Sequence, residues 1–194
     1  MHDKPRYSVL IASSNPKFDQ VLTSLLPADQ YGPVDIVDFA GLARRRLLEK
    51  EFDILIVNTP LKDEKGVGLC IDVSEETNIS TMLLIDAEHF DEISAVAEPH
   101  GVLTLSKPTS RAAVSQSLKL LCATRNRLRK MEKQTASFEE KIQEIKLVNR
   151  AKILLMEKEG ISEENAHRFI EKTAMDTRSS RSLIAQEIIS RYKE

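Results

Sequence analysis

Short apolar runs alternate with amphipathic stretches along the first part of the chain. The runs are rich in Val, Ile and Leu and occupy residues 7–12, 34–39, 54–57, 82–85 and 101–105. Their length and β-branched content predict buried strands. Apolar side chains at helical spacing predict helices at 16–26, 41–50, 67–77 and 88–98, and a further helix from about residue 110. This alternation predicts an α/β fold over residues 1–118, a flavodoxin-like doubly wound sheet of five parallel strands.

The period of the apolar pattern changes to seven residues at Leu121. Positions 121, 128, 135, 142 and 149 recur at that spacing, and 124, 131, 138 and 145 follow the first four by three residues. These are the a and d positions of a heptad seam. Neither Pro nor Gly occurs from 109 to 159, so one continuous helix is expected, with residues 119–145 as a coiled-coil connector. The helix either pairs with a second copy in parallel, which we favour, or stays a monomeric rod or bends near the polar Thr135.

Three short amphipathic helices are expected in residues 146–194. Gly160 can adopt the left-handed conformation that ends a helix, and Ser162 can cap the next helix. The buried stripe of that second helix is predicted to contain Ala166, Phe169, Ile170 and Ala174. Ser179 or Ser180 can cap the third helix, whose apolar face comprises Leu183, Ile184, Ile188 and Ile189. Helices this short need a scaffold or a partner, because they bury little surface alone.

Charge divides the chain into two parts. The first 118 residues hold 11 basic and 18 acidic side chains, whereas the rest hold 17 and 12, a net charge of −7 against +5. A basic second part suits a polyanionic partner. Cys70 and Cys122 stand among apolar residues without metal-ligand spacing, which predicts buried thiols and no metal site. No apolar run is long enough to cross a membrane and no signal peptide opens the sequence, so a cytoplasmic protein is expected.

Ligand sites in doubly wound sheets lie past the carboxyl ends of the strands. The polar residues found there are Ser13 and Ser14 after the first predicted strand, Asn58 after the third, Asp86 after the fourth and Lys107 after the fifth. With Pro108 behind Lys107, this pattern resembles the receiver domain of bacterial two-component response regulators. The resemblance implies that the lysine contacts a phosphoryl group. It also implies acids after the first strand for Mg²⁺ and a phosphoacceptor aspartate at the end of the third.

The other receiver landmarks are replaced in this chain. Ser13 and Ser14 stand at the Mg²⁺ positions, Asn58 at the phosphoacceptor position, and Asp86 where the family has Thr or Ser. Mg²⁺ needs carboxylates, and an amide lacks the anionic oxygen of a nucleophile. We therefore expect a pseudo-receiver with no phosphoacceptor and no cofactor, which serves for docking and dimerisation. Asp86 and Lys107 are expected to form an ion pair rather than a residual active site.

The last part of the chain resembles the ANTAR domain, an RNA-binding module of transcription antitermination. The matching residues are Ala151-Lys152, Leu155-Met156, Gly160-Ile161-Ser162-Glu163-Glu164, Ala166, Ala174-Met175-Asp176, Arg178 and Ile184-Ala185. Ile153 departs from the family, which often has glycine there. The order receiver, coiled coil and ANTAR domain also resembles the usual architecture of that family. The expected domains are therefore 1–118, 119–145 and 146–194.

Cationic and polar side chains of the last helices supply candidate RNA contacts. Lys and Arg bind phosphates, and a helix start offers free N–H groups to an anion. Lys152, Arg178, Ser179 and Arg181 are expected to gather near the turn between the second and third helices, and Met156 completes the candidate set. RNA hairpin loops splay their bases for stacking and edge hydrogen bonds. Because Phe169 is expected in the core, recognition is expected to use arginine stacking, backbone contacts and loop shape.

The sequence leaves two functions of different classes open. The first is a homodimeric RNA-binding antitermination regulator that binds hairpins of leader transcripts and prevents a terminator hairpin from forming. The alternative is a protein-interaction adaptor whose pseudo-receiver docks a ligand-sensing partner. Asn58 argues against a third possibility, a phosphorylated DNA-binding regulator. No enzyme class is supported, since the sequence shows neither a nucleophile with its base nor a glycine-rich phosphate loop.

Overall fold

The computed structural model describes residues 6–192 of the chain. They divide into two compact units, one ending at Lys130 and the other beginning at Met131. Helix α5 (Arg111–Glu159) contributes residues to both units. Within residues 6–192, no helix combines the length and the apolar character needed to cross a membrane.

The first unit is built on one sheet of five parallel strands in the order β2-β1-β3-β4-β5. The strands are β1 (Tyr7–Ser13), β2 (Tyr31–Val37), β3 (Ile54–Asn58), β4 (Ser80–Asp86) and β5 (Leu103–Lys107). The helices between them are α1 (Pro16–Thr23), α2 (Ala40–Glu49), α3 (Val67–Glu76) and α4 (Phe90–Ala97), with 3-10 turns η1 (Ala87–His89) and η2 (Glu98–His100). The order is that of a flavodoxin-like sheet, so the predicted fold class is confirmed.

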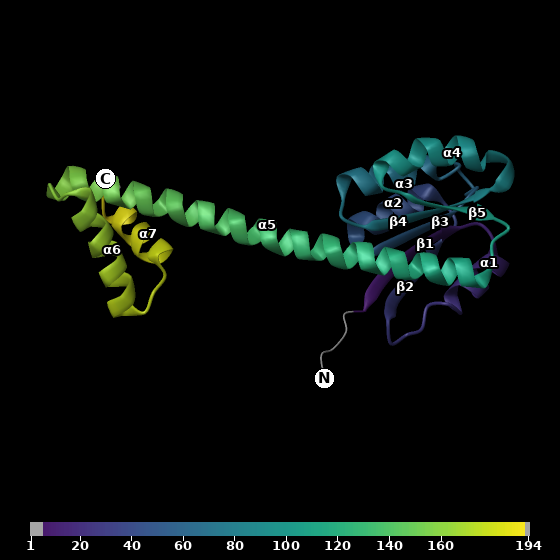
Figure 1. The fold of residues 1–194 in the computed structure, drawn as a ribbon, viewed down its shortest axis with the longest axis horizontal. Coiled ribbons are helices and arrows are strands. Elements are labelled where there is room, and N and C mark those ends of the chain that lie inside the picture. Colours follow the sequence, from purple (N-terminus) through teal and green to yellow (C-terminus); the bar gives the residue numbers. More distant parts are fainter. Residues whose placement is uncertain (1–5, 193–194) are drawn as a thin grey trace. The chain divides into compact units, whose positions relative to one another are not determined.

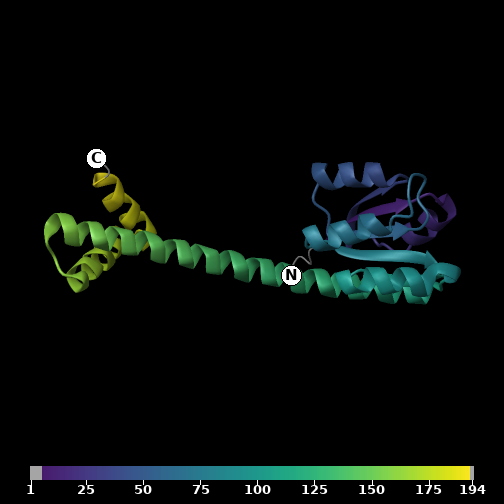
Figure 2. The same ribbon diagram turned by 90° about the horizontal axis from the view of Figure 1, so that it is seen from above.

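Helices cover both faces of the sheet (Figures 1 and 2). Helices α2, α3 and α4 pack on the face that carries Leu55 and Val57. Helix α1 and the beginning of α5 pack on the face that carries Ile54 and Ile56. Consecutive side chains of a strand point to opposite faces, and here both faces are buried. The central strands are therefore continuous apolar runs in the sequence.

A buried carboxylate fixes α5 to the amino edge of the sheet. Asp53 precedes β3, and its side chain is 9% exposed. Its Oδ2 accepts a hydrogen bond from the Ser8 amide at 3.0 Å, and its Oδ1 accepts from Arg125 Nε at 3.0 Å and Arg129 Nη2 at 2.6 Å. Burial alone would raise the pKa of Asp53, but Ser8 and the two guanidinium groups together hold this pKa below its ordinary value.

The beginning of α5 belongs to the core of the first unit and not to the predicted seam. Leu121 is 3% exposed and packs in one cluster with Val114 and Leu118. Next to it, the Cys122 Sγ lies 3.3 Å from the Tyr31 hydroxyl. The assignment of Leu121 to the heptad seam is therefore wrong, because the sheet needs this side chain to cover its α1 face.

The second unit consists of the last part of α5 with α6 (Glu163–Thr177) and α7 (Arg181–Arg191). Its core contains Val148, Ala151, Leu155, Ala166, Ile170, Ala174, Ile184, Ala185, Ile188 and Ile189. The predicted helix ends are confirmed: Gly160 has a φ of 67°, and the Ser162 Oγ accepts from the Asn165 amide at 3.3 Å. Of the two candidates for the last cap, Ser180 is the cap of α7, accepting from the Leu183 amide at 3.2 Å.

Two side chains predicted in this core point outward. Phe169 is 42% exposed and Leu183 is 45% exposed. Each is the direct neighbour of a buried isoleucine, Ile170 or Ile184. Consecutive residues of a helix diverge by about 100°, so only one of each pair can face a core as small as this one. The prediction that Phe169 and Leu183 are buried is therefore wrong.

Replacing Asp53 by Asn is expected to destabilise the first unit by about 2–3 kcal/mol at pH 7, because two part-buried guanidinium groups lose their counter-charge. The folded pKa of Asp53 is depressed, so its stabilisation is complete above the unfolded pKa of about 3.9 and is lost as pH falls through the folded pKa. Urea unfolding followed by tyrosine fluorescence should show the difference between the two proteins shrinking towards pH 3.

Asp72 provides the matched control, because its ion pair with Arg44 is more than half exposed on the Asp72 side. Asp72→Asn is expected to change stability by less than about 0.5 kcal/mol at either pH. An Asp53→Asn effect that stays constant from pH 7 to pH 3 would contradict the role of the carboxylate charge.

Candidate functional site

Strand register gathers four of the five predicted pocket residues at the carboxyl edge of the sheet. Ser13 at the end of β1 lies opposite Asn58 at the end of β3. Asp86 at the end of β4 lies opposite Lys107 at the end of β5. Ser14 turns away, because its hydroxyl donates to the Pro60 carbonyl at 2.8 Å.

Hydrogen bonds join these four side chains into a continuous chain. The Asn58 Nδ2 donates to the Ser13 Oγ at 3.1 Å. The Lys107 ammonium donates to the Asn58 Oδ1 at 3.2 Å and to the Thr59 carbonyl, and it pairs with Asp86 Oδ1 at 3.2 Å. The expected Asp86–Lys107 ion pair is therefore present. The polar atoms that would meet a phosphoryl group are already bonded to one another.

The donor set of this pocket does not fit Mg²⁺. Its centre offers the Ser13 hydroxyl and the Asn58 amide, both buried, whereas Mg²⁺ binds through carboxylates. The Asp86 side chain is 56% exposed and is bonded to Lys107. No group of three or more His, Cys, Asp or Glu side chains that could hold a metal ion occurs in residues 6–192.

Other acids near the sheet have structural roles. Asp53 lies at the opposite, amino edge, where it holds α5. Asp63 caps α2 from the loop after β3, accepting from the Ala40 amide at 2.7 Å and the Gly41 amide at 3.0 Å. These two amides lower the pKa of Asp63, as expected of a carboxylate at a helix start. Neither acid is placed to accept a phosphoryl group at Asn58.

One acid near the pocket was not identified from the sequence. Asp19 of α1 lines a cavity of about 370 Å³ together with Ser13, Asp38 and Lys62. Its Oδ1 is buried without a hydrogen-bond partner, and burial raises the pKa of Asp19 despite a hydrogen bond with Ser13. Asp38 forms an ion pair with Lys62 on the other side of this cavity. No signal in the sequence marks Asp19, which reads as an ordinary first-turn acid of a helix.

In the second unit, the turn between α6 and α7 carries one exposed cation in an unusual backbone conformation. Arg178 follows α6 with a φ of 52°, in the left-handed region. Its amide donates to the Met175 carbonyl at 3.2 Å, and the Ser179 amide donates to the Ala174 carbonyl at 2.9 Å. Glycine or asparagine usually occupies this position of a helix end. An arginine there accepts backbone strain of about 1 kcal/mol and places a guanidinium group at the tip of the turn.

Arg181, at the start of α7, is held by two acids. Its Nε and Nη2 each lie 2.8 Å from the Glu144 Oε1 of α5, and its Nη1 lies 3.6 Å from the Glu171 Oε1 of α6. Glu171 also pairs with His167 at 3.3 Å. Arg181 therefore connects all three helices of the second unit, and its charge is partly neutralised in the free protein.

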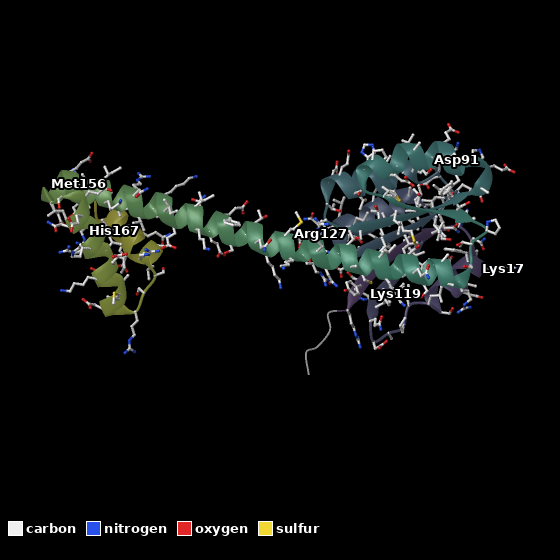
Figure 3. The ribbon with its side chains drawn as sticks, viewed as in Figure 1. Lys17, Asp91, Lys119, Arg127, Met156 and His167 are labelled. Atoms are coloured by element: carbon white, nitrogen blue, oxygen red, sulfur yellow. The ribbon has the colours of Figure 1, made fainter. Side chains whose placement is uncertain are left out.

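The structure does not bring Lys152 and Met156 to the turn of Arg178. Lys152 pairs with Glu163 at 2.8 Å, at the beginning of α6, and this ammonium lowers the pKa of Glu163. Arg178 stands at the other end of α6, whose 15 residues span about 22 Å. Met156 lies near the end of α5, and His167 lies in the first part of α6, which is the end away from Arg178 (Figure 3). The expectation that Lys152 gathers with Arg178 and Arg181 is thus not met.

An exposed row on α6 leads to the turn instead. Phe169, Lys172 and Met175 are three residues apart and exposed, with Met175 at 79%, and Arg178 continues the same spacing. Residues at i and i+3 lie close together on a helix surface. Sequence reasoning missed this row. An apolar period shows that one side of a helix is buried, but not which residues at the border of that side are exposed.

Comparisons with known proteins agree with this division of the chain. The family model described as the ANTAR domain matches residues 136–189. The transcriptional regulatory protein PdtaR of Mycobacterium tuberculosis is 23% identical over 184 residues, which cover 93% of this chain and 88% of that protein. The comparison thus relates the chain to a regulator along nearly its whole length.

Solved structures resemble the first unit. The signal receiver domain of an HD domain-containing protein from Pseudomonas fluorescens Pf-5 has a TM-score of 0.58 at 22% identity, over 64% of this chain and 93% of that one. An adenylate cyclase structure from Rhodopirellula baltica has a TM-score of 0.61 at 12% identity, over 68% of this chain and 98% of that one. At such identities these likenesses show the fold alone. The chain thus carries an ANTAR domain at residues 136–189, its first unit has the fold of receiver domains, and it is similar over most of its length to a transcriptional regulatory protein.

Proposed function

We propose that the protein is a dimeric RNA-binding regulator that acts by transcription antitermination, binding hairpins of leader RNA through α6 and α7. Arg178 is the observation that carries this proposal. A non-glycine residue in the left-handed region costs free energy, and Arg178 makes no ion pair within residues 6–192. Such an exposed cation at a turn suits an RNA phosphate or a splayed base. The ANTAR match over the same helices supports the assignment.

The row on α6 supplies the other contacts of this proposed interface. Phe169 offers an aromatic face on which a splayed loop base can stack, and Lys172 offers an ammonium group to the RNA phosphate backbone. Ser179 lies beside Arg178 and adds a hydroxyl. Arg181 contributes mainly by holding α7 in place, and it reaches RNA only if it leaves Glu144. Lys152 and Met156 lie outside this surface.

Pairing of α5 with a second copy is the proposed source of the dimer. Met131, Phe138, Ile142 and Ile145 occupy seam positions of the heptad and are 49–65% exposed. Large apolar side chains at a and d positions are stabilised when a second helix covers them. A dimer presents two copies of the α6–α7 turn to one RNA, which raises its effective affinity for paired hairpins.

Control of the protein is proposed to come from a partner or from RNA, not from phosphorylation. The bonded chain of Ser13, Asn58, Lys107 and Asp86 supports this view, because it leaves neither a nucleophile nor an Mg²⁺ site. A groove between α1 and the start of α5, about 190 Å³ and lined by Phe18, among others, favours a second candidate function, an adaptor that docks a protein partner. Co-purification of a stoichiometric protein with no RNA would select the adaptor.

Arg178→Gly is expected to separate RNA affinity from stability. Glycine relieves the left-handed strain, so the free energy of unfolding of the second unit should stay the same or rise by up to about 1 kcal/mol. Thermal unfolding should therefore occur at the same or a higher temperature. Loss of the guanidinium should weaken binding to a hairpin RNA by about 5- to 30-fold, measured by fluorescence anisotropy. Phe169→Leu keeps an apolar side chain but removes the aromatic face, and should weaken binding by about fivefold or more.

Arg45→Ala is the control for this experiment, since it removes the same charge from an exposed site on α2. Its affinity for the hairpin should match that of the unaltered protein within about twofold. Equal RNA affinity of Arg178→Gly and the unaltered protein would show that the turn between α6 and α7 is not the RNA site.

Incubation with acetyl phosphate and Mg²⁺ is expected to leave the intact mass of the protein unchanged. The reason is chemical: the Asn58 amide is not a nucleophile, and Ser13 and Ser14 do not hold Mg²⁺. Asn58→Asp alone should also stay unlabelled, because it restores the acceptor without the metal site. A stable phosphorylated species in the unaltered protein would reject the pseudo-receiver interpretation.

A further inference from the structure

The exposed apolar row on α5 continues past the predicted coiled coil into the three-helix unit. We call it the α5 stripe. Its apolar members are Met131, Phe138, Ile142, Ile145, Ile153 and Met156, which are 39–65% exposed. Asn149 interrupts the row and is also exposed. All of these residues belong to the second unit.

The α5 stripe lies on the back of α5, away from α6 and α7. At 100° per residue, its members point within about 80° of one another. Ala151 and Leu155, which are fully buried against α6 and α7, point about 120–160° away from the middle of the stripe. The bundle therefore closes its own core with one side of α5 and leaves this second apolar side uncovered.

The spacing of the α5 stripe changes where the bundle begins. A strict heptad would place Lys152 at the seam position after Asn149. The Lys152 side chain is only 15% exposed and is held by Glu163 on α6. Ile153 takes the seam position instead, so the steps from Ile142 to Met156 are three, four, four and three residues. An added step of four residues locally unwinds a coiled coil. The two α5 helices of a dimer can then run straight while each packs its opposite face on its own α6 and α7.

We infer that a second copy of the chain covers the α5 stripe through Ile153 and Met156, so that the two three-helix units associate back to back. The inference rests on the proposed dimer and extends its interface into the ANTAR domain. In this arrangement Met156 and Ile153 are dimer contacts. Each α6–α7 turn then faces away from the seam, and one dimer presents two separate RNA sites.

Asn149 indicates that the occupant is an identical chain. Its side chain makes no hydrogen bond to another residue of the described chain and sits in the middle of an apolar row. An apolar partner would bury this amide without a hydrogen bond, which costs free energy. In a parallel, in-register pair the same amide of the second copy lies opposite and can bond to it.

One flanking ion pair and one flanking polar pair favour a parallel arrangement in the first part of the heptad segment. This register sets Arg127 of one copy near Glu132 of the other, and Gln134 near Glu139. Lys141 and Lys146 meet as like charges, which weakens the pair just before the bundle. Apolar contacts at Ile153 and Met156, which follow Lys146 along α5, offset that repulsion.

Cysteine crosslinking of the full-length chain tests the inference, in a background in which Cys70→Ala and Cys122→Ser remove the native thiols. Single cysteines are introduced as Phe138→Cys in the heptad part, Ile153→Cys in the extension, and Lys158→Cys on the other side of α5. Disulfides form only when the two β-carbons approach within about 4.5 Å. Mild oxidation should therefore crosslink Phe138→Cys and Ile153→Cys but not Lys158→Cys.

The outcomes separate this inference from the proposed dimer. A crosslink at Phe138→Cys without one at Ile153→Cys overturns the extension and leaves the coiled coil intact. No crosslink at either position, with a monomer in sedimentation, overturns the proposed dimer and the extension together. Crosslinking of Lys158→Cys as fast as Ile153→Cys would show random collision and also overturn the extension.

A charge substitution gives a second readout that needs no oxidation. Ile153→Glu should weaken dimerisation in analytical ultracentrifugation by about tenfold or more, since two carboxylates are buried in the seam. Leu183→Glu on α7 starts from a similar exposure, 45% against 54%, and should leave the dimer unchanged. If Ile153→Glu spares the dimer but weakens binding to a single hairpin, the stripe contacts RNA and the inference is wrong.

Discussion

Helix α5 supplies side chains to two hydrophobic cores, and the division of its surface between them constrains the rest of the molecule. Val114, Leu118 and Leu121 complete the core of the first unit, and Ala151 and Leu155 complete that of the second. The Asp53 carboxylate, bonded to Arg125 and Arg129, holds the last part of α5 that belongs to the first unit. Beyond it, the apolar side chains of the α5 stripe, from Met131 to Met156, stay exposed on the side of α5 that faces away from α6 and α7.

The proposed loss of receiver chemistry rests on polar groups that are already bonded to one another. In the pocket, each polar group that would serve phosphoryl transfer is bonded to another, and Lys107 joins Asn58 to Asp86. A charged side chain that already has its partners gains little by meeting a new ion. In the second unit Arg178 is the contrast, since it is exposed, carries backbone strain and forms no ion pair within residues 6–192.

The sequence predicted the fold well because its signals are local. β-branched runs marked the strands, and Gly160 and Ser162 marked helix ends through backbone conformation and capping. Strand register then followed from the parallel sheet, which is why Ser13, Asn58, Asp86 and Lys107 meet as expected. These predictions depend on residues near in sequence or on a sheet order that few topologies allow.

The positions of Phe169 and Lys152 within the second unit were predicted less well, for a physical reason. A period of 3.6 residues shows that a helix has an apolar side but not where that side ends, so Phe169 was assigned to the core beside Ile170. Lys152 was placed near Arg178 although α6 separates them, because only tertiary packing decides which end of a bundle a residue occupies. The left-handed conformation of Arg178 could not be predicted from its residue type, since glycine is the usual residue at such a helix end.

The mass of the complex between the full-length protein and RNA tests the central claim most directly. Native mass spectrometry would compare an RNA that carries two hairpins with one that carries a single hairpin. A dimeric hairpin-binding regulator predicts two chains on one two-hairpin RNA, bound more tightly than the single hairpin because both turns are engaged. One chain per RNA with equal affinity for both, or no RNA-bound species, would contradict it.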